Sequence, residues 1–283
     1  MSDAPRALTP QELRRHLTDV LLRAGQFEEA WKLYEERPTR LNWSQPLSFP
    51  EWKGEPVQSL LVLPEQGLGD QIQFARYVVE LRNRGVQVTM ISPPPLVRLF
   101  KDLGVTVLPM GADVAVPRHD AWVLIASLPG RLEARTDNIP RAPYLPSSGE
   151  AGSGVGLATK GAAINTLDHE RSLPDDLSDE MRGWPGMTSL HPEDSGAADM
   201  AATARLIDGL ELVVAVDTAV AHVAGAMGKP CWLMVAHRAD WRWLTGRDDT
   251  IWYPRHRLYR QREPGDWREV VGRVKADLAR RSP

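Results

Sequence analysis

Residues 212–228 read Leu-Val-Val-Ala-Val-Asp-Thr-Ala-Val-Ala-His-Val-Ala-Gly-Ala-Met-Gly, and they point most directly to the fold class. The unbroken apolar run predicts a buried strand over 212–216, and the small residues after it predict a helix over 218–227 lying close against a sheet. At the start of such a helix the N–H groups of Thr218 and Ala219 have no intrahelical partner. They therefore form an anion site suited to a diphosphate.

Two polar side chains of this stretch have both structural and functional interpretations. Asp217 directly follows the strand, so its carboxylate either caps the helix or binds a hydroxyl of a sugar or ribose. His222 lies about one turn into the helix, where a lone histidine is more often a packed or capping residue than a catalyst. Spacing alone leaves these alternatives open.

A second strand-to-helix junction comes earlier in the chain, at residues 63–74, which read Leu-Pro-Glu-Gln-Gly-Leu-Gly-Asp-Gln-Ile-Gln-Phe. Gly67 and Gly69 allow a tight turn and leave the backbone open to a ligand. Asp70 begins the following helix, where its carboxylate either caps the helix or removes a proton from an acceptor hydroxyl. As a bare Gly-x-Gly pattern, the motif favours the structural interpretation.

Short apolar runs alternate with amphipathic stretches around both junctions. In the first half, strands are predicted over 59–63, 86–91, 105–108 and 122–126, with helices over 70–84 and 95–103. In the second half, strands are predicted over 154–158, 188–190, 212–216 and 231–235, with helices near 198–209, 218–227 and 266–280. Residues 159–186 have weak periodicity and are predicted as loop. The alternation predicts an α/β protein of two open parallel-sheet halves, with ligands bound in a cleft at the carboxyl ends of the strands.

Residues 11–39 predict a helical hairpin ahead of the two sheets, because leucine and aromatic side chains recur at helical spacing. The stretch 22–35 resembles the turn and second helix of a tetratricopeptide repeat. A single repeat cannot bury its own face, so the hairpin either packs on the following domain, which we favour, or ends a longer array. The predicted domains are the hairpin at 1–45, an N-terminal sheet domain at 57–147 and a C-terminal sheet domain at 153–283.

Composition excludes several classes of protein. The 283 residues include 34 Lys and Arg against 37 Asp and Glu, and a net charge of −3 gives no support for a nucleic-acid or anionic-membrane partner. The single cysteine, Cys231, excludes internal disulfides and cysteine-based zinc clusters and fits a reducing cytosol. No apolar run approaches the roughly 18 residues that cross a bilayer, and residues 1–10 lack the features of a signal peptide. The sequence therefore predicts a soluble, cytoplasmic protein.

Several stretches, taken together, resemble one family. They include Gly25-Gln-Phe-Glu-Glu-Ala-Trp, Pro64-Glu-Gln-Gly-Leu-Gly-Asp, Val216-Asp-Thr-Ala-Val-Ala-His and Asp240-Trp-Arg-Trp-Leu. In this order they are similar to bacterial glycosyltransferases of the GT-B type, which have two Rossmann-like domains and are related to the ADP-heptose:lipopolysaccharide heptosyltransferases. The similarity extends to the tetratricopeptide-linked members, some of which modify flagellin, and it covers nearly the whole chain.

The resemblance implies that the acceptor faces the N-terminal sheet domain. The family's Gly-Asp pair matches Gly69 and Asp70, which makes Asp70 the candidate general base. The residues expected on the acceptor side are Gln66, Gly67, Gly69, Gln71 and Gln73. The acceptor is a protein hydroxyl, as in the flagellin-modifying relatives, or a glycan.

For the C-terminal domain, the resemblance implies a bound nucleotide-sugar donor. The family's Asp-Thr-x-x-x-His element matches Asp217, Thr218 and His222, with the diphosphate at the amides of Thr218 and Ala219. Neither a metal nor another cofactor is implied, because backbone donors and the helix dipole replace the cation on the leaving diphosphate. The implied reaction is in-line displacement at the anomeric carbon with inversion.

The sequence also departs from the family pattern near the expected donor site. The loop 159–171 replaces the family's usual turn and basic loop, although Arg171 survives and Lys160 is a candidate substitute contact to phosphate. Farther on, Ser189-Leu-His-Pro-Glu stands where relatives have Ser-Leu-Gln-Lys-Gly, so a lysine is missing. Each lost cation removes a charge-assisted contact worth about 1.5–3 kcal/mol.

Aromatic and arginine side chains alternate between residues 232 and 267. Most of them are expected to wedge loops against the core or to pair with nearby aspartates. The alternative is that one aromatic ring stacks on a base or sugar while an arginine meets phosphate. The resemblance places the loop 237–249 near the donor, so Trp241 and Arg242 are the candidates for these two roles.

Three functions are compatible with these observations. The leading hypothesis is a metal-independent, inverting glycosyltransferase that uses a nucleotide-sugar. The altered loop 159–171 and the missing lysine motivate a second, a catalytically impaired relative acting as a binding or scaffold module. A different enzyme on the same scaffold, such as a nucleotide-sugar epimerase, is the third.

Overall fold

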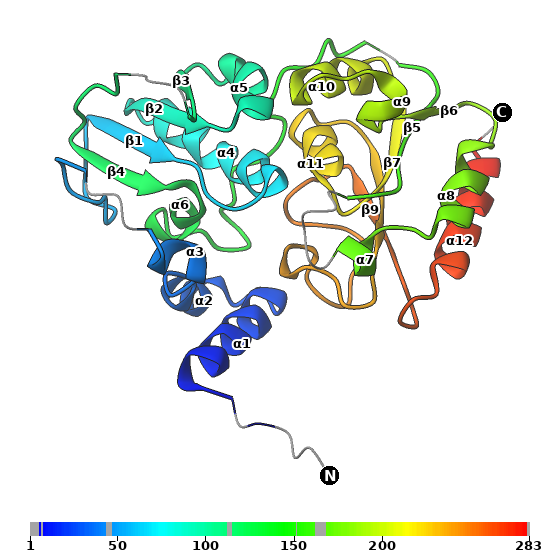
Figure 1. The fold of residues 1–283 in the computed structure, drawn as a ribbon, viewed down its shortest axis with the longest axis horizontal. Coiled ribbons are helices and arrows are strands. Elements are labelled where there is room, and N and C mark those ends of the chain that lie inside the picture. The colour runs from blue at the N-terminus through cyan, green and yellow to red at the C-terminus, as the bar shows by residue number, and fades with distance from the viewer. Residues whose placement is uncertain are drawn as a thin grey trace.

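The computed structural model describes residues 6, 8–43, 47–111, 115–150, 152–161 and 168–281. Within them, two parallel β-sheets lie side by side, each with helices packed on it (Figure 1). The first sheet has the order β3-β2-β1-β4, with β1 at Ser59–Leu63, β2 at Gln87–Ser92, β3 at Thr106–Pro109 and β4 at Ala121–Leu124. Its helices are α4 (Leu68–Asn83), α5 (Pro94–Phe100), α6 (Leu128–Arg131) and the 3₁₀ turns η1 (Lys101–Leu103) and η2 (Ile125–Ser127).

The second sheet has the order β6-β5-β7-β8-β9 and is also wholly parallel. Its strands are β5 (Val155–Ala158), β6 (Met187–Ser189), β7 (Leu212–Val216), β8 (Cys231–Val235) and β9 (His256–Arg260). Its helices are α7 (Asp168–Arg171), α8 (Asp175–Arg182), α9 (Pro192–Ser195), α10 (Met200–Asp208), α11 (Ala219–Ala226), α12 (Trp267–Ala279) and the 3₁₀ turn η3 (Trp241–Trp243). The predicted α/β class with two parallel-sheet halves is confirmed.

All eight predicted strands are present, but strand β9 and helices α7, α8 and α9 of the second half were not predicted. Strand β9 has the sequence His-Arg-Leu-Tyr-Arg, whose polar residues give no apolar run. It nevertheless pairs with β8 along its whole length. The prediction of loop over 159–186 is wrong for α7 and α8, and residues 162–167 lie outside the described part. Helix α8 is short and acidic, and it is anchored by only a few buried side chains, notably Leu177 and Met181.

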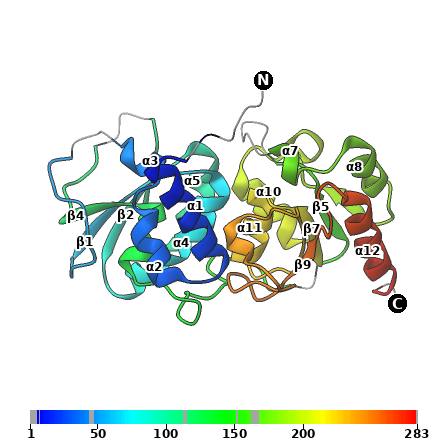
Figure 2. The same ribbon diagram turned by 90° about the horizontal axis from the view of Figure 1, so that it is seen from below.

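The N-terminal segment forms helices α1 (Pro10–Arg23), α2 (Phe27–Tyr34) and α3 (Pro38–Leu41), with α1 and α2 packed together (Figure 2). Helix α1 begins at a capping box, in which Thr9 and Glu12 satisfy each other's backbone N–H groups. Helix α2 buries Trp31, whose indole N–H donates to the Ala134 carbonyl at 2.8 Å. The predicted packing of the hairpin on the following domain is confirmed, and its tetratricopeptide character stays a prediction.

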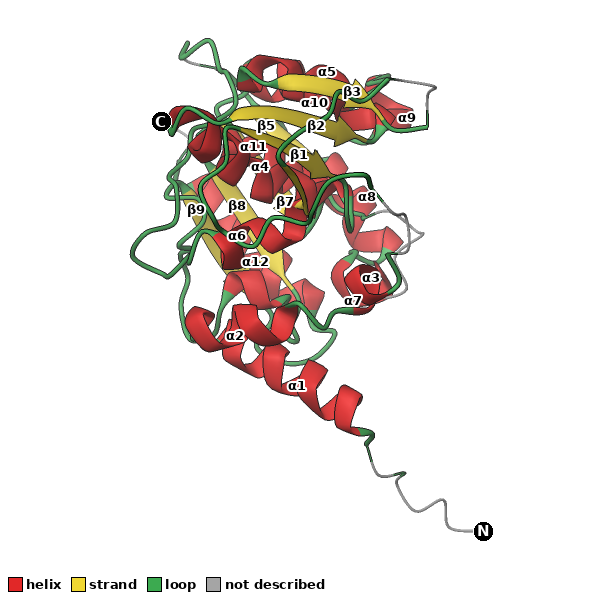
Figure 3. Ribbon diagram, turned by 90° about the vertical axis from the view of Figure 1, so that its left-hand side faces the viewer, coloured by secondary structure: helices red, strands yellow, loops and turns green. Residues whose placement is uncertain are grey.

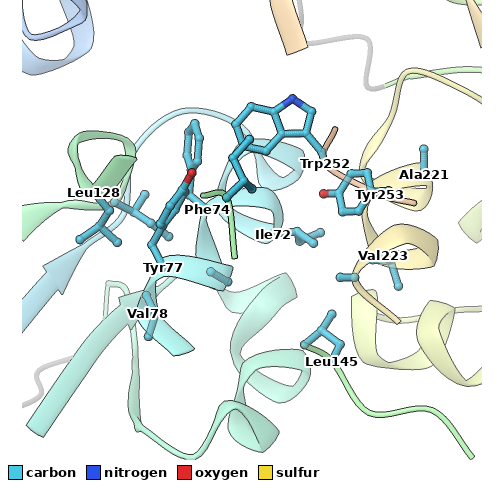
Figure 4. Packing of buried hydrophobic residues seen from close by; sticks show 14 of the residues in the cluster. Ile72, Phe74, Tyr77, Val78, Leu128, Leu145, Ala221, Val223, Trp252 and Tyr253 are labelled. Atoms are coloured by element: carbon cyan, nitrogen blue, oxygen red, sulfur yellow. The ribbon is translucent and has the colours of Figure 1, made fainter. Parts of the chain in front are cut away.

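Helices α4 and α11 join the two sheets through one continuous apolar core. In Figure 4, Ile72 of α4 lies opposite Val223 of α11 and near Tyr253, whereas Phe74 lies beside Tyr77. The same cluster contains strand residues from both sheets. Because the core is shared, the relative position of the two sheets is set by side-chain packing as well as by the connecting chain.

A fully buried cation reinforces this contact. Arg76 of α4 donates through Nη1 to the carbonyl of Trp252 at 3.0 Å and to that of Pro140 at 3.2 Å. Its guanidinium carbon also lies 4.9 Å from the centre of the Tyr253 ring. The Arg76 side chain thus donates hydrogen bonds to backbone carbonyls outside the first sheet. Figure 3 shows that α4 and α11 lie close to each other.

Among the helices of the described residues, none combines the length and the apolar character that crossing a bilayer requires.

Two glycines in helices give a matched test of this packing. A Cβ on Gly225 of α11 would lie 2.4 Å from the Tyr253 ring, whereas a Cβ on Gly272 of α12 would meet no atom within 4 Å. We expect Gly225→Ala to lower the free energy of unfolding by about 1–3 kcal/mol through overpacking. Gly272→Ala is expected to raise it by about 0.5–1 kcal/mol, because alanine loses less backbone entropy. Urea unfolding of both variants is the measurement, and equal shifts would contradict the close approach.

Candidate functional site

The site lies where the two strand-to-helix junctions meet. In each sheet the strand order reverses beside the first strand. The reversal lies between β1 and β4 in the first sheet and between β5 and β7 in the second. Ligands of such sheets bind at the carboxyl ends of strands at these points. A Cβ on Gly69 would lie 2.8 Å from His222 Cδ2 and 3.7 Å from the Ala219 Cα, so the beginnings of α4 and α11 touch. Glycine is required there by space.

The β7–α11 junction presents unsatisfied hydrogen-bonding groups. Thr218 is the N-cap of α11 with extended backbone (φ −140°, ψ 170°), and its side chain caps no helix N–H. Its hydroxyl is buried and has no hydrogen-bond partner among the described residues. Ala219 follows as the first helical residue. A buried hydroxyl beside the unpaired amides of a helix start is the arrangement that an anionic ligand completes.

His222 is held as a neutral side chain in this site. Its Nδ1 lies 2.9 Å from the Tyr253 hydroxyl, and its ring stacks on Trp243 with 5.5 Å between ring centres. Burial, with Arg242 nearby, holds the pKa of His222 well below its usual value. A neutral imidazole accepts or donates one hydrogen bond per nitrogen and carries no charge toward a phosphate.

Asp217 lies between this histidine and an open cavity. Its Oδ1 is 3.8 Å from His222 Nε2. Burial, followed by the charge of Asp240, raises the pKa of Asp217 to about 6. Its carboxyl group does not cap α11, because Thr218 occupies the N-cap position. This favours the interpretation of Asp217 as a binding group over that of a helix cap.

Asp70, the predicted base, has both carboxylate oxygens occupied. Oδ2 accepts the Gly67 N–H at 2.8 Å, so the Asp70 carboxylate caps the first turn of α4. Oδ1 accepts a hydrogen bond from Arg242 Nη2 in an ion pair that joins the two halves. The cap that the sequence suggested is therefore present. Its role as a base stays a prediction.

Arg242 is buried at the centre of the interface. Its Nε donates to Gln73 Oε1 at 2.5 Å, and its Nη1 donates to Asp240 at 2.8 Å. The neighbouring carboxylates Asp240 and Asp70 raise the pKa of Arg242 although burial opposes this. The guanidinium also lies 4.4 Å from the centre of the Trp241 ring. Arg242 thus comes from the C-terminal half and binds residues of α4.

Three glutamines predicted on the acceptor side lie close to this ion pair. Gln66 adopts φ 65°, uncommon for a residue other than glycine, and its Nε2 donates to the Tyr34 hydroxyl at 2.7 Å. Gln71 and Gln73 are buried, and each leaves one amide atom without a hydrogen-bond partner among the described residues. Unpaired amide groups at this junction are available to a bound hydroxyl compound.

A cavity of about 800 Å³ adjoins the site, on the side of the β7 and β8 carboxyl ends. Arg171 and Asp217 of the predicted residues line it, together with residues of α1. Lys160 is directed to Asp175, with 2.5 Å between Nζ and Oδ1, and Trp241 packs between Phe27, Trp31 and Trp252. Neither Lys160 nor Trp241 lines this cavity.

Some residues of the site had not been singled out by sequence reasoning. Asp240 pairs with Arg242, as expected from the aspartates near these arginines in the sequence, whereas Tyr253 and Trp243, which hold His222 from two sides, were not assigned this role. Their clustering within 240–253 was visible in the sequence, but nothing in the spacing showed which ring faces the histidine. In the part of the chain that the structure describes, no three His, Cys, Asp or Glu side chains gather as metal ligands would.

Comparisons with known proteins address the same region. Residues 179–232, which contain the β7–α11 junction, match Glycosyltransferase family 9 (heptosyltransferase). Protein FlbA of Caulobacter vibrioides is 23% identical over 320 residues, covering 92% of this chain and 53% of FlbA, so the chain spans about half the length of that relative.

Solved structures of E. coli heptosyltransferase WaaC show the same fold. The chain resembles WaaC with ADP with a TM-score of 0.56 at 11% identity, covering 78% of this chain and 99% of WaaC. WaaC with ADP-2-deoxy-2-fluoro heptose gives 0.52 at 12% identity, covering 79% and 100%. The protein therefore has the GT-B fold of glycosyltransferases. More particularly, its segment 179–232 is similar to glycosyltransferase family 9, in agreement with the sequence resemblance.

The raised pKa of Asp217 gives a test by pH. The folded state holds the Asp217 proton up to about pH 6, whereas an unfolded aspartate loses it near pH 4, so folding stability decreases as pH rises through this window. Asn at 217 lacks this proton. The unfolding free energy of Asp217→Asn minus that of wild type is therefore expected to increase by about 1–3 kcal/mol between pH 4 and pH 8. Urea unfolding across this range is the measurement, with Asp137→Asn as an exposed control. A gain independent of pH would contradict the shift.

Proposed function

We propose that the protein is an inverting, metal-independent glycosyltransferase that takes a sugar from a nucleoside diphosphate sugar. One observation carries the proposal. Thr218, at the N-terminus of α11, has a buried hydroxyl without a hydrogen-bond partner among the described residues, and the preceding Asp217 lines a cavity of about 800 Å³. This junction lies inside the segment that matches glycosyltransferase family 9.

In the proposed reaction the acceptor oxygen attacks the anomeric carbon while the bond from that carbon to the diphosphate oxygen breaks. The leaving nucleoside diphosphate carries its new negative charge to the amides at Thr218 and Ala219. The positive end of the α11 dipole stabilises this charge, which a cation would otherwise do. The acceptor's proton goes to Asp70.

Asp70 needs a free oxygen to act as a base, and in the structure Arg242 occupies Oδ1. We therefore include a step in which Arg242 leaves Asp70 when a donor binds. The donor's phosphates offer the guanidinium a stronger partner than one carboxylate, since Arg binds phosphate through two parallel hydrogen bonds. In this step Arg242 exchanges Asp70 for the donor's phosphates. The two roles predicted from sequence, Asp70 as base and Arg242 as donor contact, are therefore linked.

The first candidate donor is an ADP-sugar, because the WaaC structures contain ADP and an ADP-heptose analogue. The acceptor is a saccharide or protein hydroxyl that reaches Asp70 beside the glutamines of α4.

A second candidate function is a binding module that has the fold without the transfer activity. Two observations favour it. Both carboxylate oxygens of Asp70 are occupied, and Lys160 pairs with Asp175, which leaves the donor side with fewer free cations. A module of this kind binds nucleotide without turnover, or binds none.

Thermal unfolding with nucleotides tests the donor site. We expect ADP or ADP-sugars, in the presence of a chelator, to raise the melting temperature more than UDP, GDP or CMP at equal concentration, because only the folded state binds. Thr218→Val has nearly the same shape and loses the hydroxyl, so it is expected to weaken nucleotide binding about tenfold. A flat response at millimolar nucleotide would favour the binding module and count against the proposed donor.

Asp70→Asn tests the base. Transfer is expected to fall by about 10²–10⁴-fold while the affinity for the donor changes little, because asparagine keeps the shape but takes no proton. Hydrolysis or transfer of a radiolabelled donor sugar is measured. Asp137→Asn, which changes an exposed aspartate outside the site, is the control. Transfer at the wild-type rate in Asp70→Asn would exclude the assigned role.

A further inference from the structure

The cavity beside the donor site has one wall made by the N-terminal hairpin. Its volume of about 800 Å³ suits a whole nucleotide-sugar. Arg15 and His16 of α1 line it, as do Arg171 at the end of α7 and Asp217 and Arg238 after β7 and β8. An element outside both sheets therefore faces the residues expected to bind the donor.

Helix α1 is fixed in this position by contacts to the C-terminal half. Arg23, in its last turn, donates to the Ala239 carbonyl. In the next helix, Phe27 and Trp31 meet Trp241 with ring centres 6.3 and 5.7 Å apart. The wall is thus held by a buried aromatic cluster and a hydrogen bond, so the cavity is a built feature of the fold.

The cations of the cavity differ in whether they are already paired. Arg23 is paired with Asp19 at 2.6 Å, and Arg171 with Asp168 at 3.0 Å. Arg15 and Arg238 are exposed and make no hydrogen bond or ion pair with any residue that the structure describes. Their guanidinium donors are therefore available to a ligand.

Most acids of the cavity are already engaged. Glu12 pairs with Arg6, Asp19 with Arg23, and Asp240 with Arg242. Glu170 and Asp217 are the remaining carboxyl groups of the lining. The two free arginines come from different walls, one from α1 and one from the segment after β8, which is how a group with several anionic oxygens is held from two sides.

We propose that α1 is part of the donor site, and that Arg15 and Arg238 bind the phosphate groups of the nucleoside diphosphate from two walls of the cavity. This rests on the proposed function for the identity of its ligand. The hairpin then serves the donor side of the cavity. Arginines from two walls also supply charge that the missing lysine near Ser189 would have given.

Isothermal titration of the full chain with ADP and with inorganic pyrophosphate, in chelator and low salt, tests the proposal, and adenosine is titrated as a ligand without phosphate. Arg15→Ala is expected to weaken both ligands about tenfold, and Arg238→Ala similarly, while Arg15→Lys keeps the charge and loses less. Arg14→Ala is the matched control. It removes the same charge from the adjacent position of α1, where Arg14 pairs with Glu36 at 2.6 Å and does not line the cavity, so it is expected to leave binding unchanged.

The outcomes separate this proposal from the proposed function. If wild type binds ADP and Arg15→Ala binds it equally well, α1 is no part of the site and the donor assignment stands. If wild type binds pyrophosphate in an Arg15-dependent way but no nucleotide, the phosphate site stands and the nucleotide-sugar donor does not. Binding of neither ligand overturns both. An equal loss of ADP and adenosine affinity in Arg15→Ala would show that Arg15 meets the nucleoside and would overturn the phosphate contact.

Discussion

The relation between the two sheets depends on the buried guanidinium of Arg242. It comes from the C-terminal half and binds Asp70 and Gln73 of α4, while Asp240 neutralises it from its own side. Removing one partner of a buried ion pair leaves an uncompensated charge, which costs about 3–5 kcal/mol. The contact is therefore sensitive to the loss of any member. A ligand that replaces one member changes the interface as well as the site.

The same interface explains why the site is built from small and neutral groups. The beginnings of α4 and α11 touch because Gly69 has no side chain against His222. Burial keeps that histidine neutral, and Asp217 and Arg242 are the ionisable groups that act on it from this site. Thr218, Gln71 and Gln73 keep hydrogen-bonding groups that have no partner among the described residues. Chemistry at such a point relies on oriented backbone and side-chain dipoles more than on a dense cluster of charge.

Much of this arrangement could be predicted from the sequence. Apolar runs identified eight of the nine described strands, and the Gly-x-Gly-Asp and Asp-Thr junctions were placed correctly at strand ends. Strand β9 and helix α8 could not be found, because charged residues dominate them and tertiary packing decides their conformation. The contacts that the Lys160 and Trp241 side chains make could not be predicted either. An ion pair with Asp175 and an aromatic cluster with α2 are contacts between segments that local spacing does not relate.

The aromatic cluster around Trp241 also bears on the order in which the chain folds. Arg23 and the Ala239 carbonyl are separated by 216 residues, and Phe27 packs on Trp252 with 5.8 Å between ring centres. Loop closure over such a distance comes late, because its entropic cost is met only after much of the chain is in place. The hairpin can form its own helices early and pack Trp31 on the N-terminal domain, but Phe27 lacks its contacts with Trp241 and Trp252 until the C-terminal half exists. During synthesis, those aromatic side chains are the part of the protein most in need of protection from aggregation.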